Sequence, residues 1–489
     1  MRAPDPSPSA EPPGRAVFFR VFPSVMLPMF LAMLDQTIVA TALPAIAGSL
    51  GGVERVSWVV VSYLIATTVA APVYGRLGDL LGRRRLMVAA ILVFIAGSIL
   101  CALARSVEFL TAARVLQGLG GGGLMTLSQA LIGEAVPPRE RARYQSYLAA
   151  NAVCASTLGP VAGGFLTEAF GWTSVFLVNV PLGLVALLLT ARLNANPGSG
   201  APVRLDPLGF LFFILFVAPL LLALEGAHRI EWHTLPGAAA LVALALASLF
   251  ALVWQEGRAA SPLLPIGLLR QPAVWRSDAM AACHGATLVS LLTFVPLYLR
   301  VARGLTASET GLLLLPLTVG VGIGAMLTGQ IVSRTGRTAV VPSYGLIPAV
   351  LLLLLLAGWV PRLSNAELAI LLCVNALFLG TVMSVVQVTV QVVAGQNRLG
   401  AAAASVQFSR SVGAAFGTAL VGAVLFAVLA ALDADAAGLF GEALAHGPGV
   451  FASLPAERQA VVASEITLAF QAAFLTMAVF AAGALALAW

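Results

Sequence analysis

Stretches of about 20 predominantly apolar residues recur from about Leu27 to Trp489, and only short polar connections separate them. A helix of that length spans a bilayer, because it rises about 1.5 Å per residue and the hydrocarbon core is about 30 Å thick. Hydrophobic residues make up 60% of the 489 residues and charged residues only 10%, which is too little polar side chain to cover a water-soluble protein of this size. We therefore expect an all-α integral membrane protein.

The apolar pattern predicts about fourteen transmembrane helices. An internal repeat, described below, predicts their arrangement as two six-helix bundles with two further helices inserted between them. The expected helices span residues 24–48, 57–75, 86–104, 107–133, 144–167, 173–192, 207–225, 237–256, 277–300, 308–332, 339–360, 366–394, 401–428 and 465–488. The expected domains are a cytoplasmic tail (1–23), an N-terminal bundle (24–192), a linker with the two inserted helices (193–272) and a C-terminal bundle (273–489), which includes an acidic, solvated outer loop (429–464).

An internal repeat supports two related halves. Residues 75–83 read GRLGDLLGR and residues 329–337 read GQIVSRTGR, with the same spacing from the first glycine to the final Gly-Arg pair. Ser333 stands where the first copy has Asp79, so we expect any charged contact in the second copy to be weaker or absent. Duplicated halves are typical of transporters, in which two bundles rock about a site held between them.

Basic residues are unevenly divided between alternate connections, and every one of them is arginine. If the N-terminus is cytoplasmic, the cytoplasmic side receives the more basic connections, including residues 76, 83–85, 139, 141 and 143. Positive charge collects in short cytoplasmic loops of membrane proteins. The distribution therefore predicts that both termini are cytoplasmic and that the number of spans is even.

The first copy of the repeat predicts a conformational latch at Gly75, Asp79, Gly82 and Arg83. Glycines permit a tight turn and a close approach of helices, and Asp79 can accept hydrogen bonds from Arg83 or from a helix N-terminus. A plain positively charged cytoplasmic loop is the alternative interpretation.

Two charges lie inside expected helices. Asp35 is about 10 residues into the first helix, near the bilayer midplane, and Arg114 is within the fourth. A charge inside a span costs at least about 2.5–3.5 kcal/mol, so each side chain needs a partner or a wet cavity. We expect Asp35 to exchange a proton for substrate, because the proton affinity of such a carboxyl depends on what occupies the cavity. The alternatives are a packing role for Asp35 and an outward-reaching Arg114.

The fifth helix contains Gly159, Pro160, Gly163 and Gly164. Proline bends a helix and the two later glycines allow a close crossing, so we expect this helix to pack tightly on a neighbour. Five further polar residues within spans are candidates for the cavity; they are Gln36, Asn151, His284, Gln387 and Gln391. The amide side chains could line the cavity or join helices, and His284 could shuttle protons or be a buried neutral histidine bonded to the backbone.

Three other charged residues are assigned less specifically. Arg276 and Asp278 are expected near a cytoplasmic helix end, where capping and snorkelling account for them, whereas Arg410 lies deeper and is left open between snorkelling and the cavity.

These motifs resemble those of the major facilitator superfamily, whose loop after helix two carries Gly-x-Leu-x-Asp-x-x-Gly-Arg-Arg. The helix-four arginine, here Arg114, is implicated in proton coupling in that superfamily, and the segment from Gly159 to Gly164 is similar to its antiporter motif, although Ser146 and Ala155 replace two upstream glycines. Residues 34–44, which read LDQTIVATALP, and the inserted helix pair look like the fourteen-helix drug:proton antiporters, the multidrug exporters of the quaternary-ammonium and uncoupler type.

The resemblance implies a proton-coupled antiporter that exports lipophilic, cationic or neutral drugs and amphiphiles by alternating access. An exporter of an endogenous product, such as an antibiotic, a siderophore or a lipid, shares every motif, and a non-transporting membrane sensor is a third alternative. An enzyme is not expected, and without a phosphate-binding Gly-x-x-x-x-Gly-Lys loop ATP is not expected as the fuel.

The expected partners follow from this hypothesis. They are a small amphipathic substrate, protons and the lipid bilayer of the cell's inner membrane, with no nucleic acid, cofactor or metal, and the protein is expected to be a monomer. Sodium could replace the proton as the coupling ion.

Overall fold

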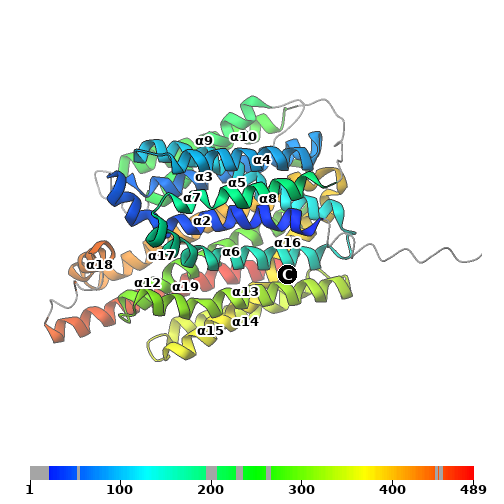
Figure 1. Ribbon diagram of the computed structural model, residues 1–489. Coiled ribbons are helices and arrows are strands. Elements are labelled where there is room, and N and C mark those ends of the chain that lie inside the picture. Colours follow the sequence, from blue (N-terminus) through cyan, green and yellow to red (C-terminus); the bar gives the residue numbers. More distant parts are fainter. Residues whose placement is uncertain are drawn as a thin grey trace, which may run out of the picture.

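The computed structural model describes residues 21–51, 55–193, 206–226, 235–259, 266–446, 450 and 455–489, and within these ranges the regular structure is helical (Figure 1). The helices are α2 (Phe22–Leu50), α3 (Trp58–Leu81), α4 (Arg83–Ala102), α5 (Val107–Ala135), α6 (Arg141–Phe170), α7 (Ser174–Leu177), α8 (Asn179–Ala191), α9 (Pro207–Gly226), α10 (Leu235–Glu256), α11 (Ile266–Leu269), α12 (Pro272–Val301), α13 (Ala307–Thr335), α14 (Val340–Trp359), α15 (Asn365–Leu379), α16 (Thr381–Ala394), α17 (Leu399–Leu432), α18 (Ala434–His446) and α19 (Ala456–Ala488), with a 3₁₀ turn at Gln396–Arg398. Residues 1–20 of the expected tail lie outside the described ranges.

Thirteen of the described helical segments are long and apolar enough to cross a membrane. They include α7 with α8 as Ser174–Ala191 and α15 with α16 as Asn365–Ala394. The fourteenth long helix is α5, whose 29 residues include a glycine run, Arg114 and Gln117, which lower its mean hydropathy. Each of the fourteen predicted spans coincides with one of these segments, so the predicted fold class is confirmed.

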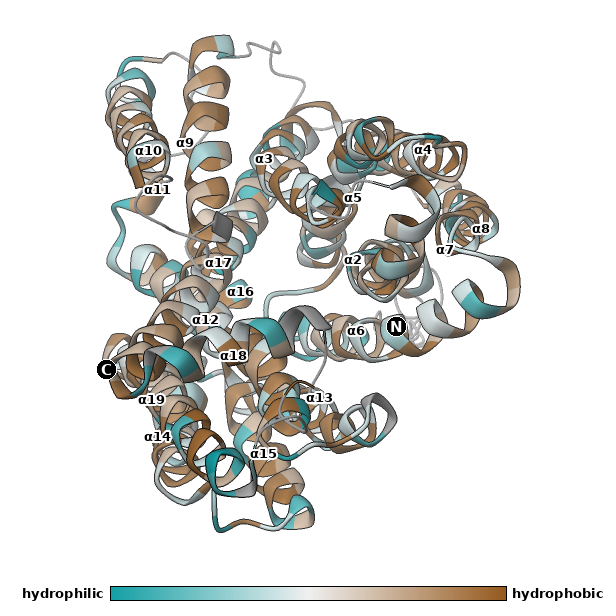
Figure 2. Ribbon diagram, turned by 90° about the vertical axis from the view of Figure 1, so that its left-hand side faces the viewer, coloured by the Kyte–Doolittle hydropathy of each residue, from teal (hydrophilic) through white to brown (hydrophobic). Residues whose placement is uncertain are grey.

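The helices form two groups, which are separate when the structure is viewed along the helix axes (Figure 2). In the first group α5 packs on α3 and α4, and α2 packs on α6; in the second, α12 packs on α17 and α19, and α13 packs on α15. The groups meet where α3 contacts α17 and where α6 contacts α13. Inserted helix α9 pairs with α10 and contacts α3 and α17, so it lies along one of these two seams.

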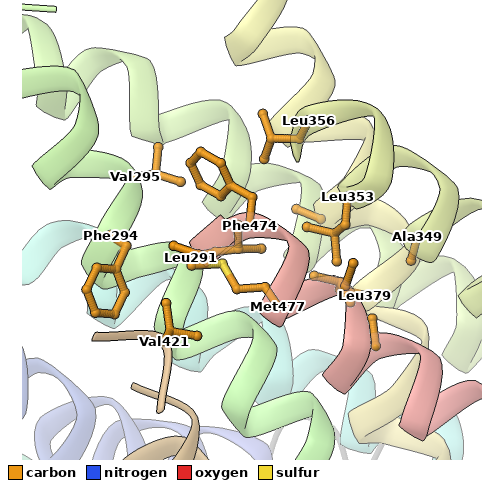
Figure 3. Packing of buried hydrophobic residues seen from close by; sticks show 14 of the residues in the cluster. Leu291, Phe294, Val295, Ala349, Leu353, Leu356, Leu379, Val421, Phe474 and Met477 are labelled. Atoms are coloured by element: carbon orange, nitrogen blue, oxygen red, sulfur yellow. The ribbon is translucent and has the colours of Figure 1, made fainter. Parts of the chain in front are cut away.

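Apolar side chains fill the interior of each group and also cover its outer faces. In the second group Leu291, Leu353, Phe474 and Met477 belong to one large buried cluster (Figure 3). On α10, by contrast, Phe250 is 76% exposed in the structure. A helix that is apolar all round is stable where lipid replaces water as the solvent, which agrees with the expected membrane location.

Local sequence signals determine where several helices begin. Thr306 and Ser364 accept hydrogen bonds from the backbone N–H groups of Glu309 and Glu367, and each glutamate carboxylate accepts one in return from the capping residue's N–H. These reciprocal capping boxes satisfy N–H groups that the first turn of a helix leaves free. The two glutamates therefore stabilise the starts of α13 and α15.

The connector at residues 429–464 differs from the expected solvated loop. Helix α17 continues to Leu432, α18 follows it, and α19 begins at Ala456. Phe440 of α18 is fully buried, with its ring centroid 5.5 Å from that of Phe426 and 6.1 Å from that of Phe470. The acidic residues of this segment predicted a solvated loop, whereas α18 also has an apolar face that packs on the second group. Residues 447–449 and 451–454 lie outside the described ranges.

Phe440→Ala should detach α18 from the second group. Removing a buried aromatic side chain costs about 3 kcal/mol or more, because it leaves a cavity between Phe426 and Phe470. Limited proteolysis should then cut within residues 434–446, and the thermal unfolding midpoint should fall by several degrees. Glu442→Ala, which alters an exposed side chain of the same helix, should leave both measurements unchanged. Equal protease resistance of the two variants would contradict this assignment.

Candidate functional site

Asp79, near the end of α3, joins the two groups of helices. Its Oδ1 accepts a hydrogen bond from the backbone N–H of Gly400 at 2.9 Å, and its Oδ2 accepts one from Ala401 at 3.1 Å. Both donors belong to the first turn of α17, where N–H groups have no partner within the helix and the helix dipole favours a negative charge. The carboxylate of the first group therefore caps a helix of the second.

Arg83 completes this latch. Its Nη2 donates to Asp79 Oδ1 at 2.6 Å and to the carbonyl oxygen of Gln396 at 3.1 Å, and its Nη1 donates to Glu134. Gly82 has φ = 96°, a conformation that favours glycine, and this lets α4 begin directly at Arg83. The structure thus brings Asp79, Gly82 and Arg83 together as predicted and adds partners in the other half.

Glycines bring the two groups into backbone contact beside the latch. A Cβ added at Gly75 would lie 2.9 Å from the carbonyl carbon of Gly400 and 3.0 Å from Cβ of Ala404. On the other seam, a Cβ added at Gly329 of α13 would lie 2.6 Å from Cβ of Ser146 in α6. The first glycine of each copy of the repeat, Gly75 or Gly329, therefore lies where the two groups approach each other closely.

The second copy of the repeat has no matching charged contact in the described structure. Ser333 replaces the aspartate, and its hydroxyl donates to the carbonyl oxygen of Gln330 in its own helix at 2.9 Å. Among the described residues, a carboxylate of the repeat therefore joins the seam between α3 and α17 but not the seam between α6 and α13.

A second polar cluster lies within the first group, around Asp35 of α2. Its carboxylate accepts hydrogen bonds from Arg114 Nη1 at 2.5 Å, Gln117 Nε2 at 2.7 Å and Asn179 Nδ2 at 2.7 Å. The side chains of Asp35 and Arg114 are 0% exposed. The pair is a fully desolvated, hydrogen-bonded ion pair, in which loss of either charge would leave the other uncompensated.

The surroundings of Arg114 fix its orientation. Its Nε donates to the carbonyl oxygen of Val59 at 3.0 Å, and its guanidinium carbon lies 4.1 Å from the ring centroid of Tyr63. Gly118 and Gly120 of α5 are in backbone contact with α3 and α4, since a Cβ at Gly118 would lie 2.8 Å from the carbonyl oxygen of Tyr63. The glycine run thus lets α3 and α4 pack closely around the helix that carries Arg114.

Part of the predicted antiporter motif packs on α2 next to Asp35. A Cβ at Gly159 would collide with Thr37, and one at Gly163 would collide with Thr41 and the backbone of Ile38. Pro160 is exposed, and a Cβ at Gly164 would meet no atom within 4 Å. The structure therefore brings Gly159 and Gly163, but not Pro160 or Gly164, into the close crossing of α6 and α2.

A cavity of about 130 Å³ lies between the two groups. Helix α9 forms one of its walls through Leu221 and Leu224, and Phe213 of the same helix packs on Phe408 of α17 with ring centroids 5.3 Å apart. The remaining lining residues come from both groups; they are Gln36, Val61, Leu64, Val289, Arg410, Ser411, Ala414, Ala415 and Thr418.

Of the five polar candidates, Gln36 lines this cavity. Gln391 instead joins the groups near the latch end, donating to the carbonyl oxygen of Gln129 at 2.9 Å, and Asn151 joins α6 to α2 by donating to Met26 at 3.0 Å. His284 and Gln387 are buried, and neither His284 Nδ1 nor the side-chain amide atoms of Gln387 have a partner among the described residues.

Asp278 is buried, unlike the residue at an aqueous helix end that the sequence predicted. Arg276 is exposed and lies over Trp275, as snorkelling requires, but Asp278 is only 7% exposed. Its Oδ1 accepts a hydrogen bond from Ser405 Oγ at 3.4 Å, and its Oδ2 has no partner among the described residues. The prediction that Asp278 caps a helix at the aqueous surface is therefore wrong, because its side chain is buried.

The profile of the Major Facilitator Superfamily matches residues 25–418. The chain belongs to this superfamily. Its members are membrane transporters rather than enzymes, in agreement with the expectation from the sequence. A solved structure of the human organic anion transporter MFSD10 superposes with a TM-score of 0.64, over 98% of this chain and 100% of that one, at 17% identity, and this likeness concerns the fold alone.

Two bacterial relatives resemble most of the chain. An uncharacterised MFS-type transporter of Mycobacterium tuberculosis is 36% identical over 413 residues, which are 83% of this chain and 59% of the relative's length. The multidrug transporter protein MdtP of Bacillus subtilis is 31% identical over 410 residues, which are 82% of this chain and 74% of that protein. The chain thus spans less than two thirds of the mycobacterial relative that it matches.

The superfamily motifs located Asp35, Arg114 and Asp79 in the sequence, but not their partners. Gln117 could have been found, because it lies three residues after Arg114 and so on the same helix face. Asn179 and the N–H groups of Gly400 and Ala401 come from distant helices, and no spacing in the sequence connects them to these carboxylates.

Asp79→Asn should loosen the seam between α3 and α17. The amide lacks the charge that Gly400, Ala401 and Arg83 bind, and a hydrogen bond to a charged group is worth about 1.5–3 kcal/mol. In a cysteine-free background, labelling of a cysteine at the buried position Ala404 should become roughly tenfold faster or more. Asp433→Asn, which removes a carboxylate outside this seam, is the control. Unchanged labelling would show that the latch does not hold the groups together.

Proposed function

We propose that the protein is a proton-coupled antiporter that exports lipophilic, amphipathic molecules from the cell by alternating access. The observation that carries this proposal is the fully buried pair of Asp35 and Arg114. Asp35 lies on α2, the helix that also carries the cavity residue Gln36. The relative MdtP, named a multidrug transporter protein, supports export of such molecules.

Alternating access requires a contact between the groups that can break. At the latch end the groups meet through Asp79, Gly75 and Gly400, which is a short polar and glycine contact. The arginines at residues 76, 83–85, 139, 141 and 143 are near this end, and the positive-inside rule assigns it to the cytoplasm, with both termini on that side. The described conformation is then closed toward the cytoplasm.

Coupling depends on the charge of Asp35. As a carboxylate it balances Arg114 and accepts three side-chain hydrogen bonds. Protonation would leave the Arg114 charge uncompensated in a dry interior, and breaking a buried pair in this way costs about 3–5 kcal/mol. That imbalance favours a rearrangement of α2, and Gln36 carries the movement to the cavity wall. A proton gradient, without a nucleotide or another cofactor, would therefore drive the cycle.

Asp35→Asn should abolish transport driven by a pH gradient. Asparagine has nearly the same shape as aspartate but cannot exchange a proton. Proteoliposomes with a pH-sensitive dye inside would report proton movement when lipophilic dyes of either charge are added, and accumulation of a transported dye should fall at least tenfold. Asp433→Asn is the control carboxylate. Undiminished gradient-driven accumulation in Asp35→Asn would exclude the proposed coupling.

A double variant distinguishes loss of proton coupling from misfolding. Asp35→Asn alone leaves Arg114 buried without its counter-charge, whereas Asp35→Asn combined with Arg114→Gln removes both charges together. The double variant should fold and bind dye but show no proton-driven accumulation. Proton-driven accumulation by this variant would assign the coupling to another group.

A further inference from the structure

Arg410 is the one charged side chain among the described residues that line the cavity. The described lining residues include no carboxylate. Asp35, one residue before Gln36, is 0% exposed and is bound to Arg114, Gln117 and Asn179 inside the first group. The wall of the cavity therefore carries a positive charge.

No described residue neutralises this charge. The ion pairs of the described residues include none to the Arg410 guanidinium, and none of their side-chain hydrogen bonds involves it. The aliphatic part of the Arg410 side chain packs closely on Gly285 of α12. A Cβ added at Gly285 would lie 3.2 Å from Arg410 Cγ. The neighbouring His284 supplies no negative charge. Arg410 is thus held in place with its donors unused.

An unpaired guanidinium in a low-dielectric site is unfavourable, and arginine cannot relieve this by losing its proton. Its planar group presents five N–H donors and no acceptor, in a fork that matches the two oxygens of a carboxylate or phosphate. A ligand with such an oxyanion would satisfy the donors and compensate the charge. A cationic ligand would be repelled from the same cavity.

The other walls are suited to a hydrocarbon body. Val61 and Leu64 of α3, Leu221 and Leu224 of α9, and Val289 of α12 present apolar side chains to the cavity. Its volume of about 130 Å³ is close to that of engineered cavities that admit benzene, so it can hold the head and first carbons of an amphiphile rather than a whole drug-sized molecule.

We propose that the substrate is an anionic amphiphile whose carboxylate or similar oxyanion binds Arg410, while its apolar body contacts α3 and α9. The inference rests on the proposed export function and specifies its substrate class. It differs from the cationic or neutral substrates expected from the sequence, because the cavity wall carries Arg410 while Asp35 is buried inside the first group. The oxyanion could belong to a free lipophilic acid or to an anionic lipid.

Binding of two matched fluorescent probes to the purified full-length protein in detergent tests the proposal. The probes are dansylaminoundecanoate and a dansyl-undecyl-trimethylammonium, which share a body and differ in head charge. Wild type should bind the carboxylate at least tenfold more tightly. Arg410→Gln should lose at least tenfold in carboxylate affinity, Arg410→Lys should lose less, and binding of the ammonium probe should not weaken in either variant.

Arg276→Gln is the matched control, because it removes an exposed arginine of α12 that does not line the cavity. Gln36→Glu provides a second test if Arg410→Gln does not fold, since it adds a carboxylate to the same cavity and should weaken the carboxylate probe at least tenfold. Equal carboxylate affinity in wild type, Arg410→Gln and Gln36→Glu, or a wild-type preference for the ammonium probe, would overturn the proposal.

Competition separates the two sources of the oxyanion. Displacement of the carboxylate probe by phosphatidylglycerol but not by phosphatidylcholine would support a lipid ligand, and displacement by decanoate alone would support a free acid. Failure of the binding preference would leave proton-coupled export intact, because that function is tested through Asp35. Conversely, gradient-driven transport by Asp35→Asn would remove the coupling mechanism but not the charge preference of the cavity.

Discussion

A charge in the interior of a helical membrane protein is stable only when hydrogen bonds or an opposite charge compensate it, and this constraint explains how the polar residues of the chain are arranged. Asp35 has three side-chain donors from two neighbouring helices, and Asp79 has the first turn of α17 together with Arg83. Each carboxylate therefore holds helices together that differ widely in sequence position. Arg410 departs from this rule, and it does so at the wall of the cavity between the groups.

The two groups of helices are built differently inside and at their contact. Large apolar clusters fill each group, whereas at the latch end the groups touch through Gly75, Gly400 and Gly329 and through a small number of hydrogen bonds. The apolar clusters that span this contact are small: Ala130 packs with Leu399 and Ala403, and Ala142 packs with Val332, Val385 and Val388. A contact of this composition can open and close repeatedly while each bundle keeps its own packing, which is what rocking of two rigid halves requires.

Much of this architecture could be predicted from the sequence, because membrane helices need long apolar runs and the fourteen runs are separated by polar turns. The repeat and the charges at Asp35, Asp79 and Arg114 were visible for the same reason: charge is rare in such a background. Their partners were not predictable, since Asn179 and Gly400 approach only through packing of distant helices. The facing direction of Asp35 was also invisible, because an aspartate in an apolar run can turn toward a cavity or toward its own bundle. Asp278 and Phe440 show that depth and burial near helix ends depend on tertiary contacts.

The positive cavity wall determines how transport would respond to voltage. If a monoanion leaves the cell while one proton enters, two elementary charges cross the membrane in the same electrical sense, each worth about 2.3 kcal/mol per 100 mV. Exchange of a monovalent cation for a proton would move no net charge and would depend on the pH difference alone. With Arg410 selecting an anion, the cycle becomes electrogenic, and an inside-negative membrane potential drives export even when the pH on the two sides is equal.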